Sequence, residues 1–194
     1  DWSAASYFFS WIALTKNDQL SLKILKKNSF QADQVLPEIY KKLSVKTKWV
    51  RNEIHIRKTK SKLKNKLSID LNDNPDIAQT IAVTCLGLGI ECYLTGLHTL
   101  NIKETNRLQA MKNELEKFNA SVIVTKDTLH LKSPTYFPNQ PVTIKTYDDH
   151  RMAMAFAPLA QKTNLTIENP EVVKKSYPDF WIDFSLFGFK ITEY

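Results

Sequence analysis

The charged residues whose spacing could support chemistry are densest in the segment KETNR. Lys103, Glu104 and Arg107 are expected in the first turn of one helix, with Lys103 and Arg107 at positions i and i+4. Cations at a helix N-terminus oppose the helix dipole, and violations of such local rules are typical of functional sites. Helix N-termini also present backbone N–H groups to anions. The segment is therefore a candidate anion-binding site, the alternative being a solvated helix start with a local ion pair.

Two further expected helix starts carry polar residues. Asp76 opens a helix and is expected to cap it, a role that by itself requires no functional explanation. His150 and Arg151 precede the run MAMAFAPLA at residues 152–160, which is apolar on all sides and should be buried. The two polar residues at the mouth of this run must face either solvent or a site. Pro158 predicts a kink or an early end of that helix.

Helix starts that carry polar residues recur with a period of about 73 residues, which indicates an internal repeat. An Asp followed by small and apolar residues occurs at Asp1, Asp76 and Asp149. A short strand is expected after each of them, at Leu20–Leu25, Ile90–Leu97 and Asn164–Asn169. A second helix start follows each strand, at Ser29, Lys103 and Lys175. If the units are related by rotation, their corresponding helix starts can converge on one site.

Each repeat is predicted to contain a helix, a strand, a second helix and two further strands. The closing strands are expected at Lys46–Val50 with Ile54–Arg57, at Ser121–Val124 with Leu129–Leu131, and at Phe189–Thr192. Entering strands are expected at Leu67–Leu71 and Val142–Thr146. The second helix of the middle unit has an apolar stripe formed by Leu108, Met111, Leu115 and Phe118.

Strand-to-helix crossovers imply parallel pairing, whereas the closing strand pair is antiparallel. We therefore expect one mixed α/β domain over residues 1–194, with units at about 1–60, 67–133 and 141–194. The first unit has no entering strand ahead of Asp1, which predicts that the chain is a piece of a longer polypeptide.

The composition narrows the class of protein. The 194 residues include 27 Lys and Arg against 20 Asp and Glu, and the formal charge of +7 favours anionic partners. The longest apolar run, residues 152–160, is far shorter than the roughly 20 residues that span a bilayer, so no membrane partner is expected. Cys85 and Cys92 lack a CxxC or Cys/His pattern, which favours buried free thiols and a cytoplasmic location over a disulfide or a metal site.

Six segments together resemble the 5-enolpyruvylshikimate-3-phosphate synthase (3-phosphoshikimate 1-carboxyvinyltransferase) family. They are DWSAASYF from Asp1, NSFQAD from Asn28, NPDIAQTIA from Asn74, NIKETNRLQAM from Asn101, TYDDHRMAMAF from Thr146 and KKSYPDFW from Lys174. The resemblance implies an enolpyruvyl transferase-like α/β domain of three βαβαββ units, an inside-out α/β barrel with mixed sheets around buried helices. It also implies a second such domain, absent from this sequence, with the active site between the two.

The resemblance implies transfer of the enolpyruvyl group of phosphoenolpyruvate to the 5-hydroxyl of shikimate 3-phosphate, with release of phosphate. It implies that Asp76 accepts the hydroxyl proton, that Glu104 moves the proton of the methylene carbon, and that Lys103 contacts shikimate 3-phosphate beside that hydroxyl. The implied phosphoenolpyruvate ligands are Arg107, Arg151 and Lys175.

Three further positions follow from the same resemblance. Asp149 and His150 would orient Arg151 and the neighbouring lysine. Thr99 stands where the family commonly offers an Asn to shikimate 3-phosphate, so one hydrogen bond to that substrate is in doubt. No cofactor and no metal are implied, and the parent enzyme is expected to be a monomer.

Three alternatives stay open at this point. The related UDP-N-acetylglucosamine 1-carboxyvinyltransferase has the same fold and chemistry. The charge of +7 and the lysine-rich residues 58–66 could indicate a nucleic-acid-binding module, although the aromatic residues are not interleaved with the lysines as stacking platforms require, and no nucleic acid partner is expected. The third alternative concerns this chain alone, which we expect to be a folded but inactive half, because the closing domain and its ligands are missing.

Overall fold

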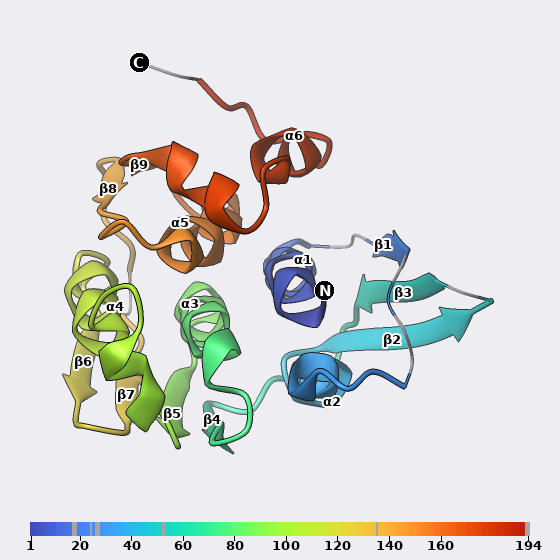
Figure 1. The fold of residues 1–194 in the computed structure, drawn as a ribbon, viewed down its shortest axis with the longest axis horizontal. Helices are drawn as coiled ribbons and strands as arrows, with labels where there is room; N and C mark the ends of the chain where they lie inside the picture. Colours follow the sequence, from blue (N-terminus) through green and yellow to red (C-terminus); the bar gives the residue numbers. More distant parts are fainter. Residues whose placement is uncertain (17–18, 24, 26–27, 52, 135, 193–194) are drawn as a thin grey trace.

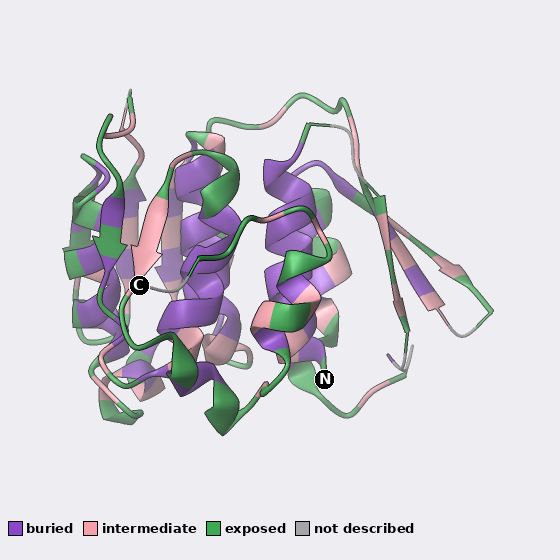
Figure 2. Ribbon diagram, turned by 90° about the horizontal axis from the view of Figure 1, so that it is seen from above, coloured by how far each residue is buried: buried purple, intermediate pink, exposed green. Residues whose placement is uncertain are grey.

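Three helices form the centre of the molecule, and the sheets and the other helices surround them (Figure 1). The computed structural model describes residues 1–16, 19–23, 25, 28–51, 53–134 and 136–192. The central helices are α1 (Trp2–Leu14), α3 (Ala78–Leu88) and α5 (His150–Phe156), and α3 packs against both of the others. Figure 2 shows them buried along most of their length. Their apolar composition on every side explains this position, because a helix without a polar face must be covered by other elements.

The middle of the chain forms a four-stranded mixed sheet. Its strands are β4 (Lys66–Asp70), β5 (Glu91–Thr95), β6 (Ser121–Val124) and β7 (Leu129–Lys132), in the order β4-β5-β7-β6. The pair β4–β5 is parallel, with Leu67 opposite Cys92, and the other two pairs are antiparallel. With α3 and α4 (Arg107–Glu116) between its strands, this region has the predicted order βαβαββ.

The first and last parts of the chain form smaller sheets. Strands β1 (Gln19–Lys23), β2 (Val45–Val50) and β3 (Glu53–Lys58) pair antiparallel in the order β1-β3-β2. Strands β8 (Val142–Ile144) and β9 (Leu165–Ile167) pair in parallel. The strand predicted at Leu20–Leu25 ends at Lys23, and residue 24 lies outside the described part.

The strand predicted at Phe189–Thr192 is wrong, because these residues form no strand in the structure. Instead, the ring of Phe189 stacks on Phe184 at a centroid distance of 4.6 Å. The side chain of Phe189 therefore packs on α6 (Phe180–Ser185) rather than in a sheet. The boundaries of the three repeats and their grouping into one domain stay a prediction.

Short 3-10 helices lead into or out of most of the α-helices. They are η1 (Ala32–Val35) before α2 (Leu36–Lys41), η2 (Pro75–Ile77) before α3, η3 (His98–Ile102) before α4, η4 (Ala157–Gln161) after α5, and η5 (Pro170–Lys175) before α6. The predicted effect of Pro158 is confirmed, since α5 ends at Phe156 and Pro158 lies in η4.

Three helix starts differ from the prediction. The start expected at Ser29 lies at Ala32, where η1 begins. Helix α4 begins at Arg107, not at Lys103, because Oδ1 of Asn106 accepts a hydrogen bond of 3.1 Å from the backbone N–H of Gln109 and caps the helix there. Lys103 has extended backbone angles, φ −85° and ψ −158°. Lys175 ends η5 and does not open a helix.

The turn between β5 and η3 requires glycine. Gly96 has φ +73°, and a Cβ atom there would lie 2.4 Å from the backbone nitrogen of Asn72 and from Oδ1 of Asp70. This close approach brings η3, and the KETNR segment after it, beside the loop that leads into η2. Among the described residues, each helix is too short or too polar to cross a bilayer.

Candidate functional site

Arg107 lies at the centre of a group of charged side chains contributed by three separate segments. It is the first residue of α4, and only 2% of its side chain is exposed. Its Nε donates to Oδ2 of Asp149 at 2.6 Å and its Nη1 to Oδ1 of Asp76 at 3.0 Å. Its Nη2 donates to Oε2 of Glu104 at 2.6 Å and to Oδ1 of Asp149 at 3.3 Å. One guanidinium therefore joins three carboxylates.

Asp76 does not cap α3, contrary to the prediction from the sequence. It lies within η2, the N-cap residue of α3 is Ile77, and no side-chain hydrogen bond caps that helix. The carboxylate of Asp76 instead pairs with three cations, Lys103 at 3.3 Å, Arg107 at 3.0 Å and Arg151 at 3.1 Å. Partial burial alone would raise the pKa of Asp76, but Arg151, Lys103 and Arg107 together lower it below its ordinary value. Asp76 is therefore ionised at neutral pH.

Asp149 performs two tasks while fully buried. Its Oδ1 accepts from the backbone N–H of Arg151 at 2.9 Å, which caps α5, and both of its oxygens accept from the guanidinium of Arg107. The backbone N–H of Asp149 also closes a turn by donating to the carbonyl of Thr146 at 2.9 Å. The start of α5 and the start of α4 are thereby joined through one carboxylate.

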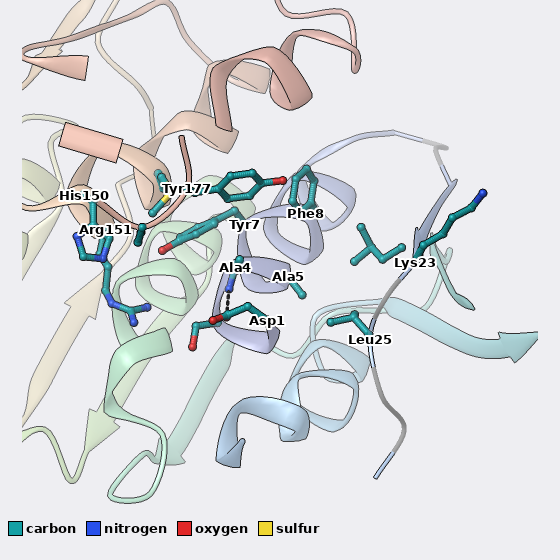
Figure 3. A pocket seen from close by; sticks show the side chains of 14 residues that line it. Asp1, Ala4, Ala5, Tyr7, Phe8, Lys23, Leu25, His150, Arg151 and Tyr177 are labelled. Carbon is teal, nitrogen blue, oxygen red and sulfur yellow. Dashed lines mark hydrogen bonds between the residues drawn. The ribbon is translucent and has the colours of Figure 1, made fainter. Parts of the chain in front are cut away.

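Arg151 lies between this group and a cavity of about 370 Å³ (Figure 3). Its Nη1 donates to the carbonyl oxygen of Asp76 at 3.2 Å and its Nη2 to Oδ2 of the same residue at 3.1 Å, while 16% of its side chain stays exposed. Tyr7 from α1 lines the same cavity, and Figure 3 shows its ring near Arg151. Burial raises the pKa of Tyr7 to about 12, against the opposing effect of Arg151. Tyr7 could not be singled out from the sequence, because it occupies one more apolar position in the run that forms α1.

His150 lines the cavity as well. Its Nδ1 is buried, forms no hydrogen bond among the described residues, and lies 3.8 Å from Oε1 of Glu104. Burial lowers the pKa of His150, although Asp149 acts in the opposite direction. The imidazole of His150 is therefore neutral at pH 7, and it lies beside Glu104 at a distance too long for a hydrogen bond.

Besides His150, two of the predicted site residues lie outside this group. Lys175 pairs with Asp148, at 2.7 Å from its Oδ1 and 2.9 Å from its carbonyl oxygen, and 45% of the Lys175 side chain is exposed. Thr99 lies in η3, where its buried Oγ1 has no hydrogen-bond partner among the described residues. Of the four cations predicted at helix starts, only Arg107 and Arg151 lie at the start of an α-helix, because Lys103 and Lys175 precede one.

We call the central group the ion-pair cluster. It consists of three cations and three carboxylates, namely Lys103, Arg107, Arg151, Asp76, Glu104 and Asp149. Lys103 and Glu104 are its more accessible members, with 34% and 39% of their side chains exposed. Planar guanidinium groups bind carboxylates and phosphates with two parallel bonds, and carboxylates next to them can exchange protons. The cluster can therefore hold anionic ligands and move protons at their edge.

A metal ion is a poor fit to this group. Glu104, Asp149 and His150 offer three ligand atoms within 4.8 Å of one another. Both oxygens of Asp149 and one oxygen of Glu104, however, already accept hydrogen bonds from Arg107. A divalent cation there would lie directly beside a buried guanidinium, and repulsion between the two charges opposes its binding.

Comparison with known proteins places the chain among enzymes of one kind. A family model described as EPSP synthase (3-phosphoshikimate 1-carboxyvinyltransferase) matches residues 1–184. A 3-phosphoshikimate 1-carboxyvinyltransferase of Bacteroides fragilis is 40% identical over 98% of this chain and 47% of its own length. One of Mannheimia succiniciproducens is 36% identical over 95% of this chain and 42% of its own length. The chain thus spans about half the length of the curated relatives it matches.

Solved structures show the same fold at low sequence identity. An EPSP synthase from Acinetobacter baumannii superposes with a TM-score of 0.75 at 20% identity, over 95% of this chain and 45% of the other. The enolpyruvyl transferase NikO from Streptomyces tendae gives a TM-score of 0.65 at 15% identity, over 97% of this chain and 43% of the other. The predicted fold class, an α/β fold with mixed sheets around buried helices, is confirmed.

Proposed function

The chain belongs to the EPSP synthase (3-phosphoshikimate 1-carboxyvinyltransferase) family, and from this premise we propose that it supplies one half of the active site of such an enzyme. The complete site would transfer the enolpyruvyl group of phosphoenolpyruvate to the 5-hydroxyl of shikimate 3-phosphate and release phosphate, on the route to aromatic amino acids. The single observation that carries the proposal is the ion-pair cluster. In this cluster Arg107 and Arg151, which follow Asp76 by 31 and 75 residues, both donate hydrogen bonds to the Asp76 carboxylate.

The cluster contains the groups that this reaction needs. In the addition step, the oxygen of the hydroxyl forms a bond to C2 of phosphoenolpyruvate, the hydroxyl proton passes to Asp76, and protonated Glu104 gives a proton to C3. In the elimination step, C3 returns a proton to Glu104, the bond between C2 and the phosphate oxygen breaks, and phosphate leaves with the proton that Asp76 had taken. Glu104 suits this role because it is among the exposed members of the cluster and has His150 at 3.8 Å.

The assignment of Asp76 as proton acceptor has a physical condition. A carboxylate whose pKa is held low by three cations is a weak base, so it accepts a proton only when the hydroxyl becomes more acidic during the reaction. Lys103, 3.3 Å from Oδ1 of Asp76, can provide this by placing its charge beside the oxygen that loses the proton. We therefore assign both residues to the same proton, with Lys103 also contacting shikimate 3-phosphate.

The proposed ligands of phosphoenolpyruvate are Arg107, Arg151 and Lys175. They differ in how many carboxylates each already binds, and so in what must be displaced before the substrate can bind. Arg151 faces the cavity, and Asp76 is the one carboxylate to which it bonds within the described part of the chain. Arg107 is buried and bonded to three carboxylates, so it can bind the substrate only if Glu104 or Asp76 gives up its place. Lys175 must likewise leave Asp148. Thr99 stays a candidate contact to shikimate 3-phosphate, with a buried hydroxyl that has no partner among the described residues.

The chain alone is proposed to be inactive. It spans about half of its relatives, and the proposed partner is the remaining part of such an enzyme. Without it, water reaches the exposed Lys103 and Glu104 and screens their charges. A monomeric parent enzyme, a cytoplasmic location and the absence of a nucleic acid partner stay predictions. The matched family disfavours both UDP-N-acetylglucosamine 1-carboxyvinyltransferase and a nucleic-acid-binding module.

Phosphate release from the two substrates tests the proposal. The chain alone and a hybrid are compared, the hybrid being the Bacteroides fragilis relative with its matched region replaced by this chain. The hybrid should release phosphate only when both substrates are present, and the chain alone should release none. Glu104→Gln in the hybrid should lower kcat by about 10²–10⁴ with a small change in KM, whereas Glu116→Gln, at an exposed position at the end of α4, should change neither. A folded hybrid that binds both substrates and releases no phosphate would overturn the proposal.

A further inference from the structure

Glu114 is a buried carboxylate that has no part in the proposed chemistry. It lies in α4, seven residues after Arg107, with 1% of its side chain exposed. Oε2 accepts from Nζ of Lys117 at 2.6 Å and from the backbone N–H of Lys145 at 3.0 Å. Oε1 accepts from the hydroxyl of Tyr147 at 2.8 Å. A buried charge is tolerated only when it is paired and fully hydrogen-bonded. Lys117 at the end of α4 supplies the opposite charge, and the segment that precedes α5 supplies the other two hydrogen bonds.

The segment held by Glu114 has an unfavourable backbone. Tyr147 and Asp148 have φ values of +56° and +57°, in a left-handed backbone region that residues other than Gly seldom adopt. Two such residues in succession persist only where the surrounding structure imposes them. The hydroxyl of Tyr147 and the N–H of Lys145 are the points at which Glu114 does so. The turn ends at Asp149, the carboxylate that binds Arg107.

Helix α4 therefore contacts this turn at two points, through a hydrogen-bond donor at one and an acceptor at the other. At its first residue Arg107 donates to Asp149, and two helical turns later, about 10 Å along the axis, Glu114 accepts from Lys145 and Tyr147. Nζ of Lys117 adds a bond of 2.8 Å to the carbonyl of Thr143 in β8. Two separated contacts fix both the position and the direction of the turn relative to the helix, which one contact could not do.

We propose that Glu114 is a positioning residue for Arg107. It fixes the turn from Lys145 to Asp149 so that the carboxylate of Asp149 meets the guanidinium of Arg107, and it thereby sets the orientation in which Arg107 faces a ligand. The effect of Glu114 on the guanidinium depends only on contacts within this chain. The effect on phosphoenolpyruvate rests on the proposed function.

The alternative role for Glu114 is general stabilisation of α4 against β8. The two roles differ in what happens to Arg107. A stabilising residue can be replaced with a loss of stability while the pair between Arg107 and Asp149 stays formed in the molecules that remain folded. A positioning residue cannot be replaced without loosening that pair in the folded state.

The test follows the Nε–H proton of Arg107 by nuclear magnetic resonance of the chain. This proton is buried and bonded to Asp149, so it should exchange slowly with water. In Glu114→Gln the exchange should accelerate by about tenfold or more under conditions where the chain is folded. The matched control is Glu116→Gln, two residues further along α4, where an exposed carboxylate pairs with Lys112 and the exchange should not change. Thermal unfolding is recorded for every variant.

A second variant keeps the test decisive if Glu114→Gln does not fold. Tyr147→Phe removes one of the three bonds to Glu114 without changing charge, and it should accelerate the same exchange to a smaller degree. A folded variant in which stability falls while the Nε–H exchange stays at its wild-type rate would overturn the positioning role. In the active hybrid, Glu114→Gln should raise KM for phosphoenolpyruvate about tenfold or more, whereas Glu116→Gln should leave this KM unchanged. Faster exchange without a change in KM would sustain the positioning role and contradict the ligand assignment of Arg107.

Discussion

Replacing Asp149 by Asn should destabilise the chain far more than the same change at its neighbour Asp148. Asp149 is fully buried, and its carboxylate lies 2.6 Å from Nε of Arg107. Asn is as good a helix cap as Asp, so α5 keeps its N-cap. The substitution therefore removes the charge without removing the cap. In the wild type the guanidinium donates to both carboxylate oxygens of Asp149, whereas the amide of Asn offers it only one oxygen.

The magnitude follows from what Arg107 retains. Removing one partner of a buried ion pair costs about 3–5 kcal/mol. Arg107 keeps Asp76 and Glu104, which are 31% and 39% exposed and therefore weaker partners. We expect a loss at the lower end of that range, about 3 kcal/mol, which is a large part of a total stability of about 5–15 kcal/mol.

Urea denaturation followed by far-ultraviolet circular dichroism at pH 7 measures the difference. The control is Asp148→Asn, at a position where 81% of the side chain is exposed and the partner is the exposed Lys175. Asn also tolerates the positive φ of Asp148, so this variant should lose less than about 1 kcal/mol. Equal losses from the two variants, within about 0.5 kcal/mol, would refute the view that Asp149 neutralises Arg107.

Gly96→Ala should cost about 3 kcal/mol, from a left-handed backbone and a clash with neighbouring atoms. Gly89→Ala, at φ +71° but with open space around it, should cost about 1–2 kcal/mol, and equal urea midpoints would contradict the steric argument. Lowering the pH through 3.8 should destabilise the wild type more than Asp76→Asn. The folded-state pKa of Asp76 lies below its ordinary value of 3.8, so the contribution of the carboxylate is present above that pH and is lost as the pH falls through the folded pKa; parallel losses in urea titrations at each pH would exclude this linkage. Cys85 and Cys92 are both buried, and burial raises the pKa of Cys85, so a thiol reagent should label them only after unfolding. Rapid labelling of the folded chain would show that the core around α3 opens.

The sequence predicted the parts of the fold that depend on local periodicity. The run after Arg151 is buried from Met152 to Leu159 as its composition requires, and the stripe from Leu108 to Phe118 forms the buried face of α4. The repeat spacing predicted the order of elements in the middle of the chain, because a parallel crossover and a closing hairpin leave few arrangements.

The start of α4 could not be predicted from its charges. The spacing of Lys103 and Arg107 suggested one helical turn, but the structure begins the helix three residues after Glu104. The available signal was Asn106 followed by Gln109, which matches the pattern of a capping residue with Gln at the third helical position.

The partners of Asp76 and the burial of Glu114 required the tertiary structure. Nothing in the local sequence distinguishes an Asp that caps a helix from one that binds Arg151, 75 residues away. Glu114 lies three residues after Met111 and four before Phe118, within the apolar stripe of α4, and a charged residue at such a position indicates a buried partner. That partner comes from the turn before α5, which no spacing within α4 reveals.

The equal number of positive and negative side chains in the ion-pair cluster has a consequence for the thermodynamics of ligand binding. A phosphate or carboxylate that enters adds negative charge to a group that is already balanced and only partly exposed to water. The lowest-energy response is for one of the three carboxylates to take up a proton as the anion binds, because a displaced carboxylate has lost the cations that kept it ionised. Binding heat should therefore depend on the ionisation enthalpy of the buffer, and affinity for anions should rise as the pH falls toward the range in which that carboxylate is protonated.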